Sequence, residues 1–283
     1  MSPAATARPA LRDPGPVAWA LIGFGLLWIA LFLVLPLAVV LAEALSRGVL
    51  PFLQVLAEPD AAAAIRLTLL VAAIAVPLNT VLGIAAAWAI AKHEFRGRSL
   101  LTALLDLPLS ISPVVAGLVF VLLFGAQGWL GPWLAAHDLK IIFAVPGMVL
   151  ATTFVTLPYV ARTMIPIMRR QGVEEEEAAA TLGAGAVTTL LRVSLPNAGL
   201  GLLYGVLLTN ARAMGEFGAV AVVSGSIRGE TTTMPLYIEI LHNEYNELDA
   251  FAVASLLALL AVVTLVLKVA LERRMARRAG KGG

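Results

Sequence analysis

The sequence contains no cysteine, few charged residues and no nucleotide-binding motif. Without cysteine the chain can form neither disulfides nor thiolate metal sites. Only 13% of its residues are charged, whereas soluble domains carry about 25%. The phosphate-binding loop G-x-x-x-x-G-K-[ST] is absent, so this chain has no such loop to hold ATP. Zinc motifs, a nucleophile elbow and paired catalytic carboxylates are absent too, and we therefore expect no enzyme, no metal and no cofactor.

Long hydrophobic runs make up most of the chain. Hydrophobic residues make up 60% of the chain, and its mean hydropathy is +0.91. A membrane-spanning helix needs roughly 20 mostly apolar residues. Six segments meet this length, namely residues 17–42, 67–91, 100–125, 141–161, 197–223 and 250–267. The first is too long for the apolar region of a signal peptide. The sequence predicts one all-α membrane domain with six transmembrane helices.

The distribution of lysine and arginine predicts which ends face the cytoplasm, because these residues resist translocation. With the N-terminus inside, the inner segments hold Arg8, Arg12, Lys92, Arg96, Arg98, Arg162, Arg169, Arg170, Arg192, Lys268, Arg273, Arg274, Arg277, Arg278 and Lys281. The outer segments hold only Arg47, Arg66, Lys140 and Arg228. We therefore expect a multi-pass protein of a bacterial inner membrane with both termini in the cytoplasm. Its expected parts are an N-terminal segment 1–16, a membrane domain 17–271 with a cytoplasmic loop 162–196, and a basic tail 272–283.

Prolines recur inside the predicted spans, at Pro36, Pro77, Pro108, Pro113, Pro146 and Pro158. Each removes a backbone donor and kinks its helix, which a bundle tolerates when neighbouring groups satisfy the freed carbonyl. Irregular packing and a moving pathway are both compatible with this pattern.

The cytoplasmic loop combines an acidic run with small residues. Four carboxylates, residues 174–177, are placed to begin a short helix, where negative charge complements the helix dipole. Gly183 and Gly185 then permit a sharp turn, and a second short helix is expected over residues 187–194. From composition alone this loop is either a solvated surface or a docking surface for another protein.

The spacing within this loop resembles the EAA loop of ABC importer permeases. Glu177, Ala178 and Ala179 are followed after three residues by Gly183, and after nine more by Val193, Ser194, Leu195 and Pro196. Val193 replaces the isoleucine that is usual in that pattern. The resemblance implies the ABC type I importer permease fold, with a coupling helix that docks on a separate ATPase subunit. The expected docking residues are Glu177, Ala178, Ala179, Gly183, Val193, Leu195 and Pro196.

The resemblance extends beyond the loop. Residues 209–268, with ARAMGEFGA, IRGETTTMP and EILHNEYN, are similar to the W-type permease subunit of sulfate/thiosulfate ABC importers, and residues 105–125 are similar to its third helix. This likeness implies a subunit that forms half of a translocation pathway. Its implied partners are an ATPase dimer, a second homologous permease subunit, a periplasmic sulfate-binding protein and sulfate or thiosulfate.

Charged residues inside and beside the fifth span are the remaining candidates. Arg212 and Glu216, at i and i+4, are expected on one helical face, either as a self-neutralising pair or as part of the anion pathway. We add Asn210 to these candidate pathway residues. Arg228 and Glu230 follow on the outer side, where they lie either in a solvated loop or against the binding protein. Asp106 is expected to pair with an arginine or to cap a broken helix.

Two other functions remain open at this stage. A molybdate or tungstate permease shares the ARAMGEFGA stretch. A secondary anion transporter would work without an ATPase, although such proteins often carry an inverted repeat, and we find no clear one here. An assembly scaffold without a pore is a third possibility.

Overall fold

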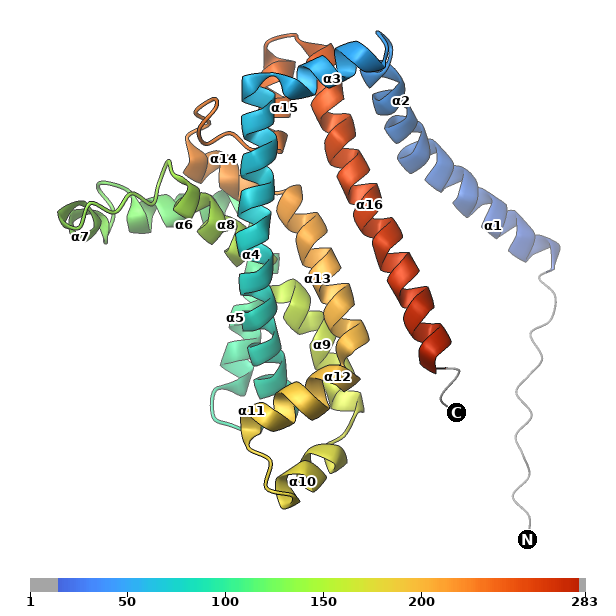
Figure 1. Cartoon of the computed structure of the whole chain (residues 1–283), viewed down its shortest axis with the longest axis vertical. Coiled ribbons are helices and arrows are strands. Elements are labelled where there is room, and N and C mark those ends of the chain that lie inside the picture. Colours follow the sequence, from blue (N-terminus) through green and yellow to red (C-terminus); the bar gives the residue numbers. More distant parts are fainter. Residues whose placement is uncertain (1–14, 280–283) are drawn as a thin grey trace.

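The computed structural model describes residues 15–279, and all the regular structure in this range is helical (Figure 1). The segments 1–14 and 280–283 lie outside the described residues, together with the expected basic residues Arg8, Arg12 and Lys281. The helices are α1 Pro16–Ile29, η1 Ala30–Val34, α2 Leu35–Ala44, α3 Val49–Ala57, α4 Pro59–Lys92, α5 Arg98–Ser110, α6 Pro113–Phe124, α7 Gly131–Ala136, α8 Val145–Thr156, α9 Pro158–Arg170, α10 Glu174–Thr181, α11 Ala186–Thr189, η2 Leu190–Ser194, α12 Leu195–Asn197, α13 Gly199–Met214, α14 Gly218–Ser224, α15 Met234–Asn243 and α16 Glu247–Ala279.

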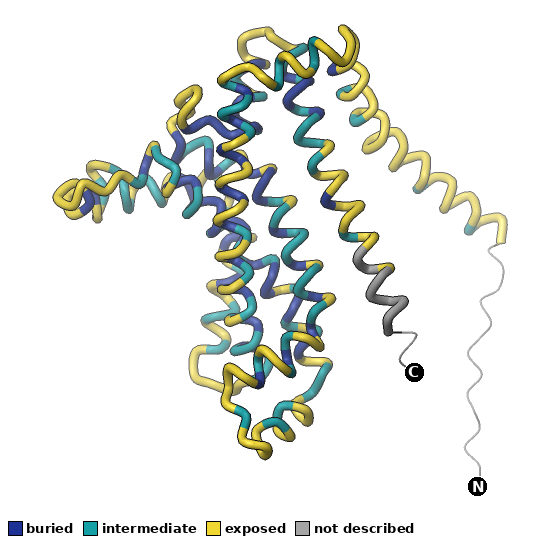
Figure 2. Tube along the Cα trace, viewed as in Figure 1, coloured by how far each residue is buried: buried dark blue, intermediate teal, exposed yellow. Residues whose placement is uncertain are grey.

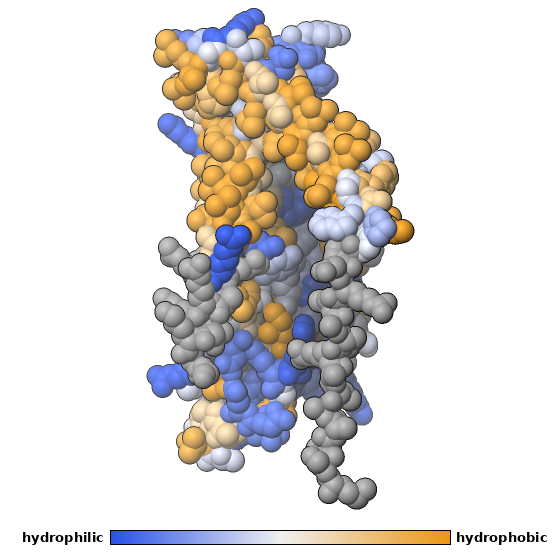
Figure 3. Space-filling model, turned by 90° about the vertical axis from the view of Figure 1, so that its right-hand side faces the viewer, coloured by the Kyte–Doolittle hydropathy of each residue, from blue (hydrophilic) through white to orange (hydrophobic). Residues whose placement is uncertain are grey.

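Four helical segments in the described range are long and apolar enough to cross a membrane, and two bent pairs raise the number to as many as six. The four are Pro16–Ala44, Pro59–Lys92, Val145–Arg170 and Glu247–Ala270. The predicted all-α membrane fold is confirmed. On the face that Figure 3 shows, hydrophobic side chains cover most of the upper half, while hydrophilic ones gather in the lower half and in patches at the top.

The third predicted span, residues 100–125, is broken into two helices at Pro113, one of the prolines expected to kink its helix. Helices α5 and α6 meet at an angle of 110°. The break follows from Pro113, which begins α6 and disfavours helical geometry at the preceding residue, so Ser112 is extended. Helix α6 consequently projects away from the long α4, and α7 lies at its far end (Figure 1).

The fifth predicted span, residues 197–223, differs from expectation. Its continuous helix α13 ends at Met214, and the residues beyond form the separate helix α14. At its other end, the segment Ala186–Asn197 meets α13 at 82°. The charged residues predicted on one continuous helix therefore lie at a helix end.

The buried core gathers around α4, which packs against α8, α9, α13 and α15. Buried residues of one large cluster come from α4, α8, α14 and α15, and include Val71, Met148 and Val220. In contrast, no residue of α1 is buried within the chain, and this helix runs away from the bundle (Figure 2). The stability of the bundle therefore depends on the contacts of α4 rather than on the first helix.

Candidate functional site

Helix α10 and the segment from α11 to α12 form a helical hairpin at one end of the bundle, which we call the coupling hairpin (residues 174–197; Figure 1). The acidic run Glu174, Glu175, Glu176 and Glu177 occupies the first turn of α10. There the carboxylates face the positive end of the helix dipole. This is the placement that the sequence predicts. The preceding helix α9 continues to Arg170, so only residues from 171 onward leave the bundle.

Glu176 fastens the coupling hairpin to the bundle, and Glu175 links the two arms of the hairpin. Glu176 Oε1 lies 2.9 Å from Nζ of Lys92, the last residue of α4, and their side chains are only 15% and 4% exposed. The hydroxyl of Ser194 donates to the same oxygen at 2.6 Å. Glu175 accepts a hydrogen bond from Asn197. One carboxylate thus joins α4, α10 and η2, which limits how far the coupling hairpin can move alone.

A sharp turn separates the two arms of the coupling hairpin. Gly183 has a φ of +83°, a left-handed conformation that glycine adopts without steric strain. Gly185 has a φ of −73° and caps the start of α11, so only the first of the two predicted glycines needs left-handed geometry. Directly before the turn, Leu182 is 88% exposed.

The expected docking residues divide between the surface of the coupling hairpin and its root. Glu177 and Ala178 are exposed, and Ala179 is half-buried. Glu177 also lines a cavity of about 420 Å³ together with Trp88 and His93. By contrast, Leu195 packs against the buried cluster around Met164. Pro196 is exposed beside the 82° bend, and Val193 is half-buried.

The sequence analysis missed an apolar surface on the coupling hairpin. Leu182, Val187 and Leu191 are 88%, 69% and 56% exposed and all belong to this hairpin. Their position after an acidic helix offered a signal, because exposed apolar residues outside the spans indicate a contact surface.

Arg212 and Glu216 form an ion pair of 2.6 Å between Nη1 and Oε2. The Glu216 side chain is 1% exposed and that of Arg212 is 33% exposed. Because α13 ends at Met214, Glu216 lies in the break and accepts the backbone N–H of Ala219 at 3.0 Å. The pairing was expected, but the single helical face was wrong. The Glu216 carboxylate therefore binds both Arg212 and the first turn of α14.

Asn210 lies between helices rather than in open space. Its Nδ2 is 3.5 Å from the hydroxyl of Thr264 on α16 and 3.4 Å from the sulfur of Met214. This arrangement links α13 to α16.

The predicted outer-loop residues differ from one another in their surroundings. Arg228 donates a hydrogen bond to Glu244, beside the start of α16, whereas Glu230 is exposed. The hydrogen bond raises the pKa of Arg228 and lowers that of Glu244. Thr231, Thr232 and Thr233, which follow Glu230, are only 3–4% exposed, so they do not lie in a solvated loop.

A buried polar cluster inside the bundle was not predicted. Asn79 on α4 donates to the backbone carbonyl of Thr153 at 3.0 Å and to the hydroxyl of Thr156 at 2.6 Å. Pro158, two residues after Thr156, has no N–H for the Phe154 carbonyl, and the Leu157 N–H bonds that carbonyl instead. The Thr153 carbonyl therefore has no helical partner and accepts from Asn79. Sequence patterns contain no signal for this contact, since its residues are 74 to 77 positions apart.

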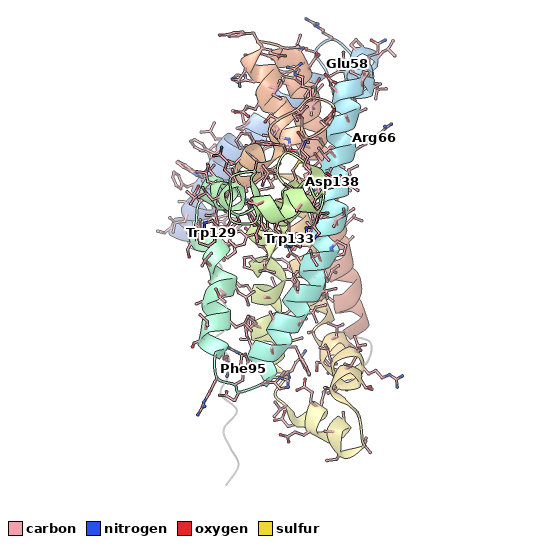
Figure 4. The ribbon with its side chains drawn as sticks, turned by 90° about the vertical axis from the view of Figure 1, so that its left-hand side faces the viewer. Glu58, Arg66, Phe95, Trp129, Trp133 and Asp138 are labelled. Atoms are coloured by element: carbon pink, nitrogen blue, oxygen red, sulfur yellow. The ribbon has the colours of Figure 1, made fainter. Side chains whose placement is uncertain are left out.

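Exposed aromatic residues mark the projecting segment. Trp129 and Trp133 lie at and beside α7 and are 88% and 55% exposed (Figure 4). In the part of the chain that the structure describes, no group of three or more histidine, aspartate or glutamate side chains is placed to hold a metal ion.

Together, the apolar spans, the two bent pairs and the anchored coupling hairpin define a multi-pass helical membrane permease. The chain belongs to the family described as binding-protein-dependent transport system inner membrane component, whose profile matches residues 79–277. It is 56% identical to the sulfate transport system permease protein CysW of Synechocystis sp., over 91% of this chain and 94% of that protein. It is 53% identical to CysW of Escherichia coli K12, over 93% and 91%, respectively.

More distant relatives agree with this assignment. The chain is 36% identical to the sulfate transport system permease protein CysT of Escherichia coli K12, over 91% of this chain and 93% of that protein. It shares the fold of a bacterial ABC transporter that imports the acidic polysaccharide alginate, with a TM-score of 0.74 at 18% identity, over 93% of this chain and 95% of that chain. The CysT protein is named as a transport permease, in keeping with the family of this chain, and the alginate transporter shows the shared fold.

Proposed function

We propose that the chain is the transmembrane permease subunit of an ATP-driven sulfate or thiosulfate importer and forms half of its translocation pathway. The observation that carries this proposal is the coupling hairpin. Its EAA spacing coincides with a turn at Gly183 and with an anchor of Glu176 on Lys92. The relatives named as sulfate permeases, at 53–56% identity, support the substrate class.

The coupling hairpin would dock on a separate ATPase subunit. The proposed docking residues are Glu177, Ala178, Ala179, Gly183, Val193, Leu195 and Pro196. Leu182, Val187 and Leu191 add an apolar surface for the same partner, because all three are more than half exposed. Closure of an ATPase dimer would then push on the coupling hairpin, and Glu176 would transmit the movement to α4 through Lys92.

The other proposed partners are a second, homologous permease and a periplasmic sulfate-binding protein. The chain resembles both the CysW and the CysT proteins, which supports a pathway made by two related subunits. A solved neighbour of the same fold, with a TM-score of 0.77 at 16% identity, over 92% of this chain and 94% of that chain, is a complex with a substrate-bound periplasmic protein. Arg228 and Glu230 are proposed to contact the binding protein. The proposed pathway residues are Arg212, Glu216 and Asn210.

We also propose that both termini lie in the cytoplasm, as fifteen inner and four outer basic residues predict. In this arrangement the coupling hairpin is cytoplasmic, and the opposite end of the bundle, where Glu58 follows α3, faces outward (Figures 1 and 4). The proposed parts are the segment 1–16, the membrane domain 17–271 with its loop 162–196, and the tail 272–283.

The experiment that tests this function uses two matched proline variants of the coupling hairpin. Gly183→Pro forces a positive φ toward about −65°, so the turn cannot form. Gly185→Pro makes the same change two residues later, where φ is already −73° and no atom crowds the position. We would isolate the tagged chain in mild detergent, identify the co-purifying proteins by mass and measure ATP-dependent uptake of labelled sulfate.

The native chain and Gly185→Pro are expected to recover an ATPase and a second permease and to import sulfate. Gly183→Pro is expected to keep the second permease, lose the ATPase and stop importing. If the native chain co-purifies with no ATPase and still imports sulfate, the protein is a secondary transporter instead. Uptake of molybdate in place of sulfate would contradict the substrate class only.

A further inference from the structure

An ion pair between two spanning segments is not used by the function described so far. Nε of Arg162 on α9 lies 2.8 Å from Oδ1 of Asp106 on α5. Among the described residues, this is the ion pair that joins two different spanning segments. The other pairs lie within one turn, at the coupling hairpin, or outside the spans.

Both side chains of this pair are open to their surroundings. Arg162 is 54% exposed and Asp106 is 37% exposed. The pair uses Nε of the guanidinium, and no described residue bonds its two terminal nitrogens. The planar end of Arg162 can therefore offer further N–H donors to a group outside the chain.

Hydrocarbon is a poor environment for these donors. Arg162 lies eight residues before the end of α9, or about 12 Å at a rise of 1.5 Å per residue. Arg162 also begins the proposed inner loop 162–196, and a charge at the inner end of a span faces water or a protein partner rather than lipid. On the same helical face, Pro166 and Arg169 follow at i+4 and i+7 and are also exposed. This face forms an unbroken strip of exposed side chains from Arg162 to the coupling hairpin.

We propose that Arg162 contacts the transported divalent oxyanion in the inner half of the pathway, and that Asp106 keeps this contact weak. The proposal rests on the proposed function. A guanidinium suits an oxyanion because its N–H groups form a rigid fork. A lone arginine would hold a dianion too long for transport. The carboxylate 2.8 Å away offsets the positive charge, so the anion can leave.

Arg162 suits this role better than Arg212. The terminal nitrogen Nη1 of Arg212 is already bound to Glu216, and that carboxylate is 1% exposed. No described residue bonds the terminal nitrogens of Arg162, and its partner Asp106 is 37% exposed. An approaching anion can thus reach Arg162 without opening a buried pair.

Three neutral variants separate an anion contact from a structural pair. They are Arg162→Gln, Asp106→Asn and the double variant, each in the complete complex with its ATPase, second permease and receptor in proteoliposomes. We expect Arg162→Gln to lower labelled-sulfate uptake by at least about tenfold, since a charge-assisted contact is lost, while receptor-stimulated ATP hydrolysis persists. Asp106→Asn should slow turnover and lower the half-saturating sulfate concentration. The double variant should behave like Arg162→Gln, and Arg162→Lys should recover part of the uptake.

A purely structural pair gives a different pattern. In that case each single variant loses assembly, and the double variant recovers native uptake because no unpaired charge remains. This result would overturn the proposal, as would native uptake by Arg162→Gln. If the native complex imports no sulfate, the proposed function fails together with this inference. If the native complex imports sulfate and Arg162→Gln matches it, only this inference fails.

The absence of cysteine allows a direct test of the surroundings of Arg162. Arg162→Cys should react with a charged, water-soluble thiol reagent, and sulfate should slow the reaction. Arg169→Cys, at the exposed end of α9, is the positive control. Leu265→Cys is the apolar control, because Leu265 on α16 is 56% exposed and should react only with a lipophilic reagent. A cysteine at 162 that behaves like the one at 265 would overturn the proposal.

Discussion

Glu176 has a different role from its neighbours in the acidic run, although all four residues are glutamates. Its carboxylate is bound by Lys92 and Ser194, whereas Glu177 is exposed and forms no ion pair among the described residues. The sequence pattern marks Glu177 because it belongs to the EAA spacing. Only the fold distinguishes the residue that anchors the coupling hairpin from the residue that is free to contact a partner.

Removal of Lys92 should loosen the coupling hairpin. Lys92→Met leaves Glu176 largely buried without its cation, so the free energy of unfolding should fall by about 2–3 kcal/mol. Recovery of the ATPase with the tagged chain should fall as well. Denaturation in detergent and co-purification measure the two effects. Glu174→Gln is the control, because Glu174 is exposed and forms no ion pair among the described residues; an equal loss there would contradict the anchoring role.

The Arg228–Glu244 pair should contribute to stability in a pH-dependent way. The hydrogen bond from Arg228 lowers the pKa of Glu244 below its ordinary value of 4.5. The contribution is therefore complete above that value and is lost as the pH falls through the lowered pKa. The thermal midpoint of Glu244→Gln should lie slightly below that of the native chain at neutral pH and coincide with it in strong acid. Glu230→Gln should match the native chain at both, since Glu230 has no ion pair in the described structure.

At the scale of elements, the fourth span is one helix with an irregular turn at Leu157, and the neighbouring helix α4 binds the carbonyl that this turn leaves free. Pro158 separates α8 from α9, and the carbonyl is that of Thr153, to which Asn79 of α4 donates. Helix α9 leads directly into the coupling hairpin. This joint is therefore placed where movement of the hairpin would reach the bundle.

Loss of the Asn79 side chain should destabilise this joint. Asn79→Leu leaves a buried carbonyl unsatisfied, so the free energy of unfolding should fall by about 1–3 kcal/mol. In a Pro158→Ala background the loss should be smaller. Alanine at 158 has an N–H that can bond the Phe154 carbonyl, so the Leu157 N–H can bond the Thr153 carbonyl instead of Asn79. A double-mutant cycle in detergent measures this coupling. Thr80→Val is the control, since its hydroxyl bonds only Val76 of the same helix; additive effects of Asn79 and Pro158 would refute the joint.

At the scale of the whole molecule, the orientation in the membrane can be tested with one exposed residue at each end of the bundle. Leu182 in the coupling hairpin and Tyr245 before α16 are 88% and 90% exposed. We expect a membrane-impermeant thiol reagent added to intact cells to label Tyr245→Cys but not Leu182→Cys. Inverted vesicles stripped of peripheral proteins should give the opposite result, since the ATPase no longer covers Leu182 there. Because the chain itself has no cysteine, each variant carries a single target. Labelling of both positions from the same side would contradict the proposed topology.

The sequence by itself determined the features that depend on short segments: the apolar runs, the acidic start of α10 and the turn at Gly183. The length of an apolar run and local backbone preference act within about one helix, so consecutive residues of the sequence are enough to predict them. Tertiary structure alone decided the angle of the 110° break at Pro113, the 82° bend, the end of α13 before Glu216, and the burial of Thr231, Thr232 and Thr233. It also brought Asp106 to Arg162 and Asn79 to Thr153, across 56 and 74 positions. Such contacts depend on how whole helices pack, and no local pattern encodes the partner of a charge or of a freed carbonyl.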